Sequence, residues 1–86
     1  MPATAHEIEE ARRRLVAWIK WYMRAHPHDC GTQVAVAQKL GVTQGAVSLW
    51  FKVGSKRLPD FETLLSIRKL IGVPIDVLLG TDPPSG

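Results

Sequence analysis

Apolar residues in the first third of the chain recur three or four positions apart, which is the spacing of one face of an α-helix. Thr4 and Glu7 have the spacing of a capping box, and Pro27 disfavours helix at the residue before it. The pattern therefore predicts a long amphipathic helix that opens at Thr4 and ends near Ala25. Its apolar stripe consists of Ile8, Ala11, Leu15, Trp18, Ile19, Tyr22 and Met23.

Four shorter helices are predicted after this one, because each has an apolar face between residues that start and stop helices. Thr32, Thr43 and Asp60 are suitable N-caps, while Gly41 and Gly72 suit the helix ends. No segment alternates between apolar and polar residues, so we expect an all-α domain of about five helices. The predicted spans are 32–41, 43–52, 60–72 and 74–80, with loops at 26–31 and 53–59.

Composition narrows the class of protein. The chain has 86 residues, of which 45% are hydrophobic and 22% are charged, as expected for one globular domain. No apolar run is long enough for a membrane span, and the charged start of the chain does not resemble a signal peptide. A single cysteine, Cys30, excludes an internal disulfide. We expect a cytoplasmic protein, with residues 1–3 disordered and residues 81–86 as a flexible tail.

Charge is distributed unevenly along the chain, whose formal net charge is +3. Residues 30–59 contain no acidic side chain, but they contain Lys39, Lys52, Lys56 and Arg57. A segment whose charges are all basic favours an anionic partner such as nucleic acid, because neutralised phosphates release their counterions. The alternative is a solvated basic surface without a partner, and charge does not separate the two.

Residues 33–52 meet the requirements of two short helices that cross at a tight corner. Ala37 is small enough for the two backbones to approach closely, and Gly41 tolerates the positive φ that the turn needs. This combination predicts a helix-turn-helix unit, whereas the alternative is an αα-hairpin that does not bind DNA. The apolar residues expected to hold the corner together are Val36, Leu40, Val42, Val47 and Trp50.

The same stretch resembles the lambda-repressor-like (Cro/C1, or XRE) helix-turn-helix family. The likeness extends from Thr32 to Gly80, while the first helix matches only in position and amphipathic character. The resemblance implies a compact five-helix DNA-binding domain over residues 4–80. We also expect no cofactor, no metal and no catalytic residue. The matching positions are Gln33, Ala37, Leu40-Gly41-Val42, Thr43-Gln44, Val47-Ser48 and Trp50.

The resemblance also implies how residues contact DNA. Gln44 matches the residue that reads a base edge, often adenine, and a glutamine amide can bond adenine N6 and N7 together. Gln33 matches a phosphate-binding glutamine that can brace the first residue of the recognition helix. Gln44, Ser48 and Lys52 are expected to form one stripe along this helix. The expected base contacts are Gln44, Gly45, Ser48 and Leu49, and the expected phosphate contacts are Gln33, Thr43, Lys52, Ser55, Lys56 and Arg57.

The chain departs from the family at the end of the recognition helix. The family commonly has glycine three residues after the tryptophan, where this chain has Val53, and Gly54 follows. We therefore expect a loop shifted by about one residue relative to the family, which leaves the duties of Lys52, Ser55 and Lys56 open.

Residues 26–30 contain possible metal ligands, namely two histidines, an aspartate and Cys30. No second pair of histidines or cysteines follows, so a polar loop is expected there rather than a metal site. Cys30 lacks an assured charge partner, so we do not expect it to be a nucleophile.

Two features of the first helix have structural and functional interpretations. Residues 12–14 are three arginines, which we expect on a solvated face paired with Glu9 and Glu10, with a phosphate contact as the alternative. Trp21 lies off the main apolar stripe, and it is expected to cover the edge of the core, with a dimer contact as the alternative.

The function that follows is a sequence-specific transcriptional regulator, expected to be a bacterial or phage repressor, which binds double-stranded DNA with the helix from Thr43 to about Lys52. One such domain covers few base pairs, so a homodimer on a palindromic operator is expected. The alternative is an antitoxin or other interaction module with a toxin as partner, although residues 81–86 make a short tail for that role. An enzyme is not expected, because no carboxylate pair, phosphate-cradling loop or nucleophile–base spacing occurs.

Overall fold

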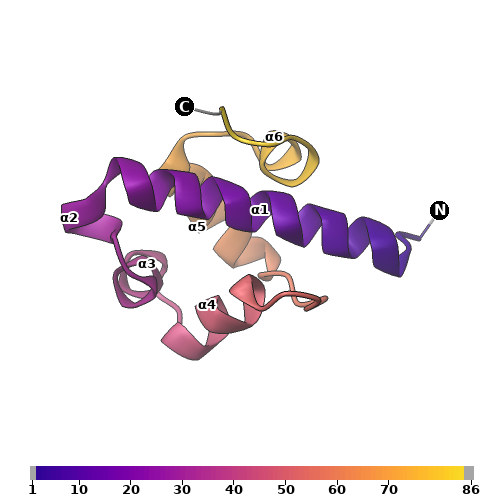
Figure 1. Cartoon of the computed structure of the whole chain (residues 1–86), viewed down its shortest axis with the longest axis horizontal. Helices are drawn as coiled ribbons and strands as arrows, with labels where there is room; N and C mark the ends of the chain where they lie inside the picture. The colour runs from indigo at the N-terminus through magenta and orange to yellow at the C-terminus, as the bar shows by residue number, and fades with distance from the viewer. Residues whose placement is uncertain (1, 85–86) are drawn as a thin grey trace.

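The computed structural model describes residues 2–84, and this part of the chain forms six α-helices and no strand. In Figure 1, α1 crosses the middle of the molecule, α6 lies on one side of it, and α3 and α4 lie on the other. The prediction of an all-α domain is confirmed. The helices are α1 (Ala5–Ala25), α2 (Pro27–Cys30), α3 (Gln33–Leu40), α4 (Gln44–Phe51), α5 (Phe61–Ile71) and α6 (Ile75–Gly80).

The helices begin at the predicted caps. The Thr4 side chain accepts a hydrogen bond from the backbone N–H of Glu7, whose carboxylate accepts one from the backbone N–H of Thr4 in return. Thr32, Thr43 and Asp60 accept in the same way at the starts of α3, α4 and α5. Each cap satisfies a backbone donor that has no partner within its helix, so neighbouring residues alone define these boundaries.

A short helix, α2, replaces part of the loop predicted for residues 26–31, which corrects the helix count from about five to six. Pro27 stands at its first position, where no backbone N–H is needed and the φ of proline already suits a helix. The Cys30 N–H donates to the His26 carbonyl at 2.8 Å, and the Cys30 side chain is buried. A Cβ at Gly31 would clash with the Pro27 carbonyl oxygen, so glycine is required where the chain turns into α3.

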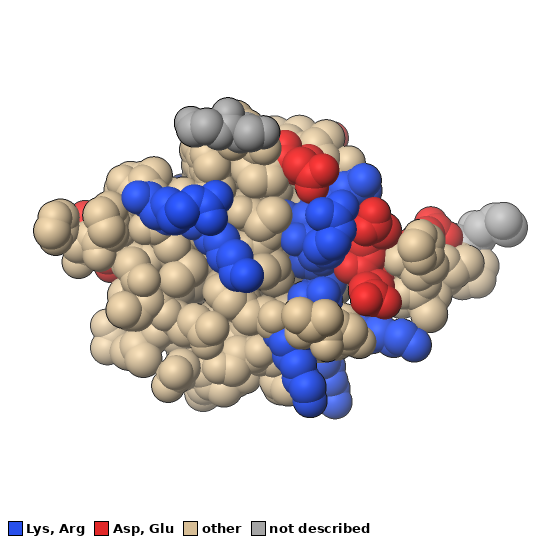
Figure 2. Space-filling view, in the orientation of Figure 1, with Lys and Arg blue, Asp and Glu red and all other residues tan. Residues whose placement is uncertain are grey.

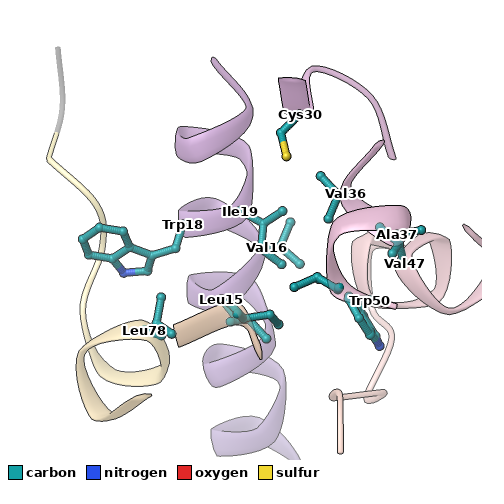
Figure 3. Close-up of a cluster of buried hydrophobic side chains, with 12 residues drawn as sticks. Leu15, Val16, Trp18, Ile19, Cys30, Val36, Ala37, Val47, Trp50 and Leu78 are labelled. Atoms are coloured by element: carbon teal, nitrogen blue, oxygen red, sulfur yellow. The ribbon is translucent and has the colours of Figure 1, made fainter. Parts of the chain in front are cut away.

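The core lies around α1, as Figure 3 shows. Leu15, Ile67 and Leu78 are fully buried and come from α1, α5 and α6. Val36 and Val47 bring α3 and α4 against the same cluster. Because every long helix contributes to one core, α1 acts as a platform that fixes the directions of α3 and α4.

The C-terminal end of the described chain is tied to α1. The indole N–H of Trp18 donates to the Thr81 carbonyl at 2.9 Å, although the sequence predicts a flexible tail from residue 81 onward. Residues 2–3 are exposed and non-helical. Residues 82–84 are also non-helical, and residues 1 and 85–86 of the predicted flexible ends lie outside the described residues.

Candidate nucleic-acid interface

The corner between α3 and α4 has the geometry that its sequence predicts. Gly41 has a φ of +71°, a left-handed conformation that glycine adopts without strain. The Val42 N–H donates to the Ala37 carbonyl at 3.0 Å, and the Gly41 N–H donates to the Gln38 carbonyl at 3.3 Å. These two bonds form a Schellman motif, so α4 leaves the corner in a fixed direction.

One face of α4 is buried and the opposite face is exposed. Val47 and Trp50 pack into the core. Exposed amide and hydroxyl groups are those that bond base edges, and an exposed apolar side chain suits a thymine methyl. No residue of α4 carries a charge, so its exposed face is suited to bases more than to phosphates. This face brings together all the predicted base contacts, Gln44, Gly45, Ser48 and Leu49.

A side-chain hydrogen bond joins α3 to the exposed face of α4. The Ser48 hydroxyl donates to Oε1 of Gln33 at 2.8 Å. Gln33 is therefore a brace for α4, but its partner is Ser48 in place of the first recognition-helix residue, Gln44, which the resemblance implies. The first turn of α3 and the middle of α4 lie side by side, close enough for the Gln33 side chain to reach Ser48.

The helix α4 ends one residue before the predicted stripe does. Lys52 caps α4 with a φ of −66°, which suits a helix, and a ψ of 125°, which is extended, so the chain leaves the helix after Lys52. The Ser55 N–H donates to the Lys52 carbonyl at 3.0 Å, and Gly54 has a φ of +80° in this turn. Gln44, Ser48 and Lys52 are all exposed, the first two within α4 and Lys52 at its C-cap, where the loop begins.

The loop after α4 carries the basic residues predicted as phosphate contacts. Lys52, Lys56 and Arg57 are exposed, and the half-buried Ser55 accepts a hydrogen bond from the Arg57 N–H at 3.1 Å. Figure 2 shows Lys and Arg side chains along the lower edge of this view, beneath the end of α4, and acidic side chains over the N-terminal part of α1. An exposed polar helix beside a cationic loop suits a polyanion.

Arg12 is buried, which corrects the prediction of a solvated face at residues 12–14. Its side chain is 5% exposed, and Nη1 donates to the Trp50 carbonyl at 2.7 Å. This carbonyl belongs to the last turn of α4, where carbonyls lack a partner within the helix and the helix dipole is negative. Arg12 therefore fixes the end of α4 from α1, a role that sequence reasoning missed because the two residues are 38 positions apart.

The ion pairs predicted between the arginines and glutamates of α1 are confirmed in part. Arg13 lies 2.9 Å and Arg14 lies 3.9 Å from a Glu10 carboxylate oxygen, so both pair at helical spacing as expected. The hydrogen bond from Arg13 lowers the pKa of Glu10 below its ordinary value. Arg13 also lies 3.5 Å from an Asp82 carboxylate oxygen, and none of the ion pairs found in residues 2–84 uses Glu9. Trp21 is half-buried against the core edge, as predicted.

Other kinds of site find no support in this part of the chain. Among residues 2–84, no group of three or more His, Cys, Asp or Glu side chains is placed to hold a metal ion. None of the helices just described is both long and apolar enough to cross a membrane. Desolvation raises the pKa of the buried Cys30 thiol, which favours the less reactive protonated form.

Comparisons with known proteins agree with this geometry. A family model described as helix-turn-helix, of the Cro/C1 (XRE) type, matches residues 31–78. The matched residues begin just before α3 and extend through α4 and α5 into α6. They make up more than half of the chain. No curated protein and no solved structure matches the chain.

Proposed function

The chain belongs to the Cro/C1-type helix-turn-helix family of DNA-binding regulators, and from this premise we propose that it is a repressor of a specific double-stranded DNA site. The observation that carries the proposal is the exposed face of α4 described above. Gln44 bonds an adenine edge, Gly45 lets the backbone approach the groove, and Leu49 contacts a thymine methyl. Ser48 makes the remaining base contact.

Phosphate contacts flank this face and hold α4 in its groove. Gln33 and Thr43 lie at the starts of α3 and α4, and the basic loop follows α4. Such contacts position a recognition helix without reading sequence, and they make the affinity depend strongly on salt. The contacts in the loop come from Lys52, Ser55, Lys56 and Arg57.

The proposed assembly on DNA is a homodimer on a palindromic operator. A two-fold dimer places its two recognition helices in successive major grooves about 34 Å apart. Val53 is 90% exposed and Phe61 is 67% exposed, and both lie outside the core and outside the α4 face. Phe61 supplies apolar surface for the contact between copies, whereas Val53 lies in the loop assigned to the phosphates.

Selection of bound duplexes from a random library tests this function. The wild-type chain is expected to enrich one palindromic sequence, and Gln44→Ala is expected to lose preference at one base pair in each half-site. Gln38→Ala is the matched control, because Gln38 is an exposed glutamine on α3 away from the α4 face. The proposal fails if no sequence is enriched above non-specific binding, or if Gln44→Ala, like the control, selects the same site as the wild type.

A further inference from the structure

The hydrogen bond between α3 and α4 determines which hydrogen-bonding groups Ser48 has left for a ligand. A serine hydroxyl carries one hydrogen and two acceptor lone pairs. Ser48 Oγ lies 2.8 Å from Oε1 of Gln33 and directs this hydrogen to it, and the Ser48 side chain is exposed on α4. Ser48 therefore meets a ligand with acceptor lone pairs only.

The orientation of the Gln33 amide supports the same polarity once DNA is bound. With Oε1 turned toward Ser48, the Nε2 hydrogens of Gln33 are free to donate. A phosphate oxygen requires a donor, so a phosphate contact at Gln33 uses Nε2 and keeps Oε1 on Ser48. The reversed amide would place a carbonyl oxygen against the phosphate charge, which is unfavourable.

We propose that Ser48 is an acceptor-only reader that selects adenine or cytosine on the strand it contacts. In the major groove, adenine N6 and cytosine N4 carry amino hydrogens, whereas guanine and thymine present acceptors and the thymine methyl. The Gln33 phosphate contact thus fixes a base preference that Gln33 does not itself read. This inference rests on the proposed DNA-binding function and adds the base class that one residue recognises.

Library selection with variants at both positions tests the proposal. The base pair read by Ser48 is the one whose preference Ser48→Ala removes, and wild type is expected to favour adenine or cytosine there by roughly fivefold, the value of one hydrogen bond. Gln33→Ala frees the hydroxyl hydrogen, so guanine and thymine become acceptable at that position. Gln33→Glu still accepts from Ser48 but repels the phosphate, so it lowers affinity for all sequences and keeps the preference.

A base analogue gives an independent measurement. Where adenine is selected, its replacement by purine, which lacks the N6 amino group, weakens wild-type binding by roughly fivefold and leaves Ser48→Ala binding unchanged. Where cytosine is selected, a pyrimidinone that lacks the N4 amino group serves in the same way. A wild-type preference for guanine or thymine at this position overturns the inference, as does a Ser48→Ala variant that changes no position. Both results leave the proposed function standing if a site is still enriched, whereas no enrichment by any variant is a failure of that function.

Discussion

Arg12 and Gln33 hold α4 in place through contacts with residues far away in the chain. Arg12 reaches Trp50 across 38 positions, and Gln33 reaches Ser48 across 15. Neither separation leaves a periodic signal, so the sequence predicts a solvated Arg12, and it predicts Gln33 as a brace only through a family resemblance. The exposure of Gln44 was predictable from the sequence, because it follows from the 3.6-residue period of one helix.

Replacement of Arg12 by methionine is expected to lower the free energy of unfolding by about 1–3 kcal/mol, because the Trp50 carbonyl loses its partner in a buried place. The end of α4 is then held less firmly, so affinity for DNA also falls. Urea unfolding and a DNA titration measure the two effects.

Arg13→Met is the matched control for this change, because Arg13 forms an exposed ion pair with Glu10. Such pairs contribute at most about 1 kcal/mol, so the control is expected to have the smaller effect on unfolding and none on DNA affinity. Equal losses in the two variants would show that the Arg12 contact does not hold α4.

Replacement of Gly45 by alanine is expected to change the stability of the fold and the affinity for DNA in opposite directions. A Cβ at this helical position would meet only the Thr43 hydroxyl oxygen, at 3.9 Å. Gly45→Ala is therefore expected to stabilise the fold by up to about 1 kcal/mol through reduced chain entropy. The added methyl group lies on the exposed face of α4 that we propose approaches the bases, so DNA affinity should fall in the same variant.

Thermal unfolding and DNA titration of Gly45→Ala are compared with those of Gly80→Ala. Gly80 is at the end of α6, on the other side of α1, and its Cβ would also enter open space. This control is expected to leave DNA affinity unchanged. Unaltered DNA affinity in Gly45→Ala would contradict a close approach of α4 to the bases.

Among the elements, caps were the most predictable feature and α2 the least. Thr32 and Thr43 bond backbone groups three residues away, so a short stretch of sequence contains the whole interaction. Residues 27–30 have a proline that suits a helix start, but four residues are too few for a periodic pattern. Their helical turn depends on Cys30 being buried against α1, which only the folded chain provides.

The cap of α5 gives stability a dependence on pH. The hydrogen bonds from Thr63 lower the pKa of Asp60 below its ordinary value of 3.8. A carboxyl group with a lower pKa in the folded state stabilises the fold above its unfolded pKa, and this stability is lost as pH falls through the folded pKa. The urea midpoint of wild type is therefore expected to fall as the solution is acidified below about pH 4.

Asp60→Asn retains an oxygen acceptor for the cap but does not titrate. Its urea midpoint should decline less steeply over the same acid range, and the remaining decline reports other carboxylates such as Glu10. Parallel declines for the variant and the wild type would exclude Asp60 as a source of the pH dependence.

For the whole molecule, sequence patterns predicted the class of fold but not the contact between α1 and the segment after α6. Apolar faces on successive helices are sufficient to predict a helical domain with one core. The hydrogen bond from Trp18 to the Thr81 carbonyl joins residues 63 positions apart, in a segment whose composition is typical of a frayed end. This contact ties the segment after α6 to α1, on the side away from α3 and α4 in Figure 1.

Trp18→Phe is expected to lower the free energy of unfolding by about 1–3 kcal/mol, since the Thr81 carbonyl loses its donor and a buried ring becomes smaller. Trp21→Phe, at the half-buried neighbouring aromatic, should cost less. Urea unfolding compares the pair, and DNA affinity should stay unchanged in both because neither residue lies near the α4 face. A larger cost for Trp21 would contradict the role given to the Thr81 contact.

The reactivity of the Cys30 thiol provides a measure of how often the domain opens. The Cys30 side chain has no exposed surface, and Cys30 is the only cysteine in the chain. A thiol reagent in solution therefore reacts only in the fraction of time that α2 separates from the core, so the labelling rate measures how often the domain opens. Operator DNA that binds only the closed domain should slow this reaction in proportion to its occupancy. Mass spectrometry of the single adduct would then follow DNA binding through a sulfur atom that is buried in the core.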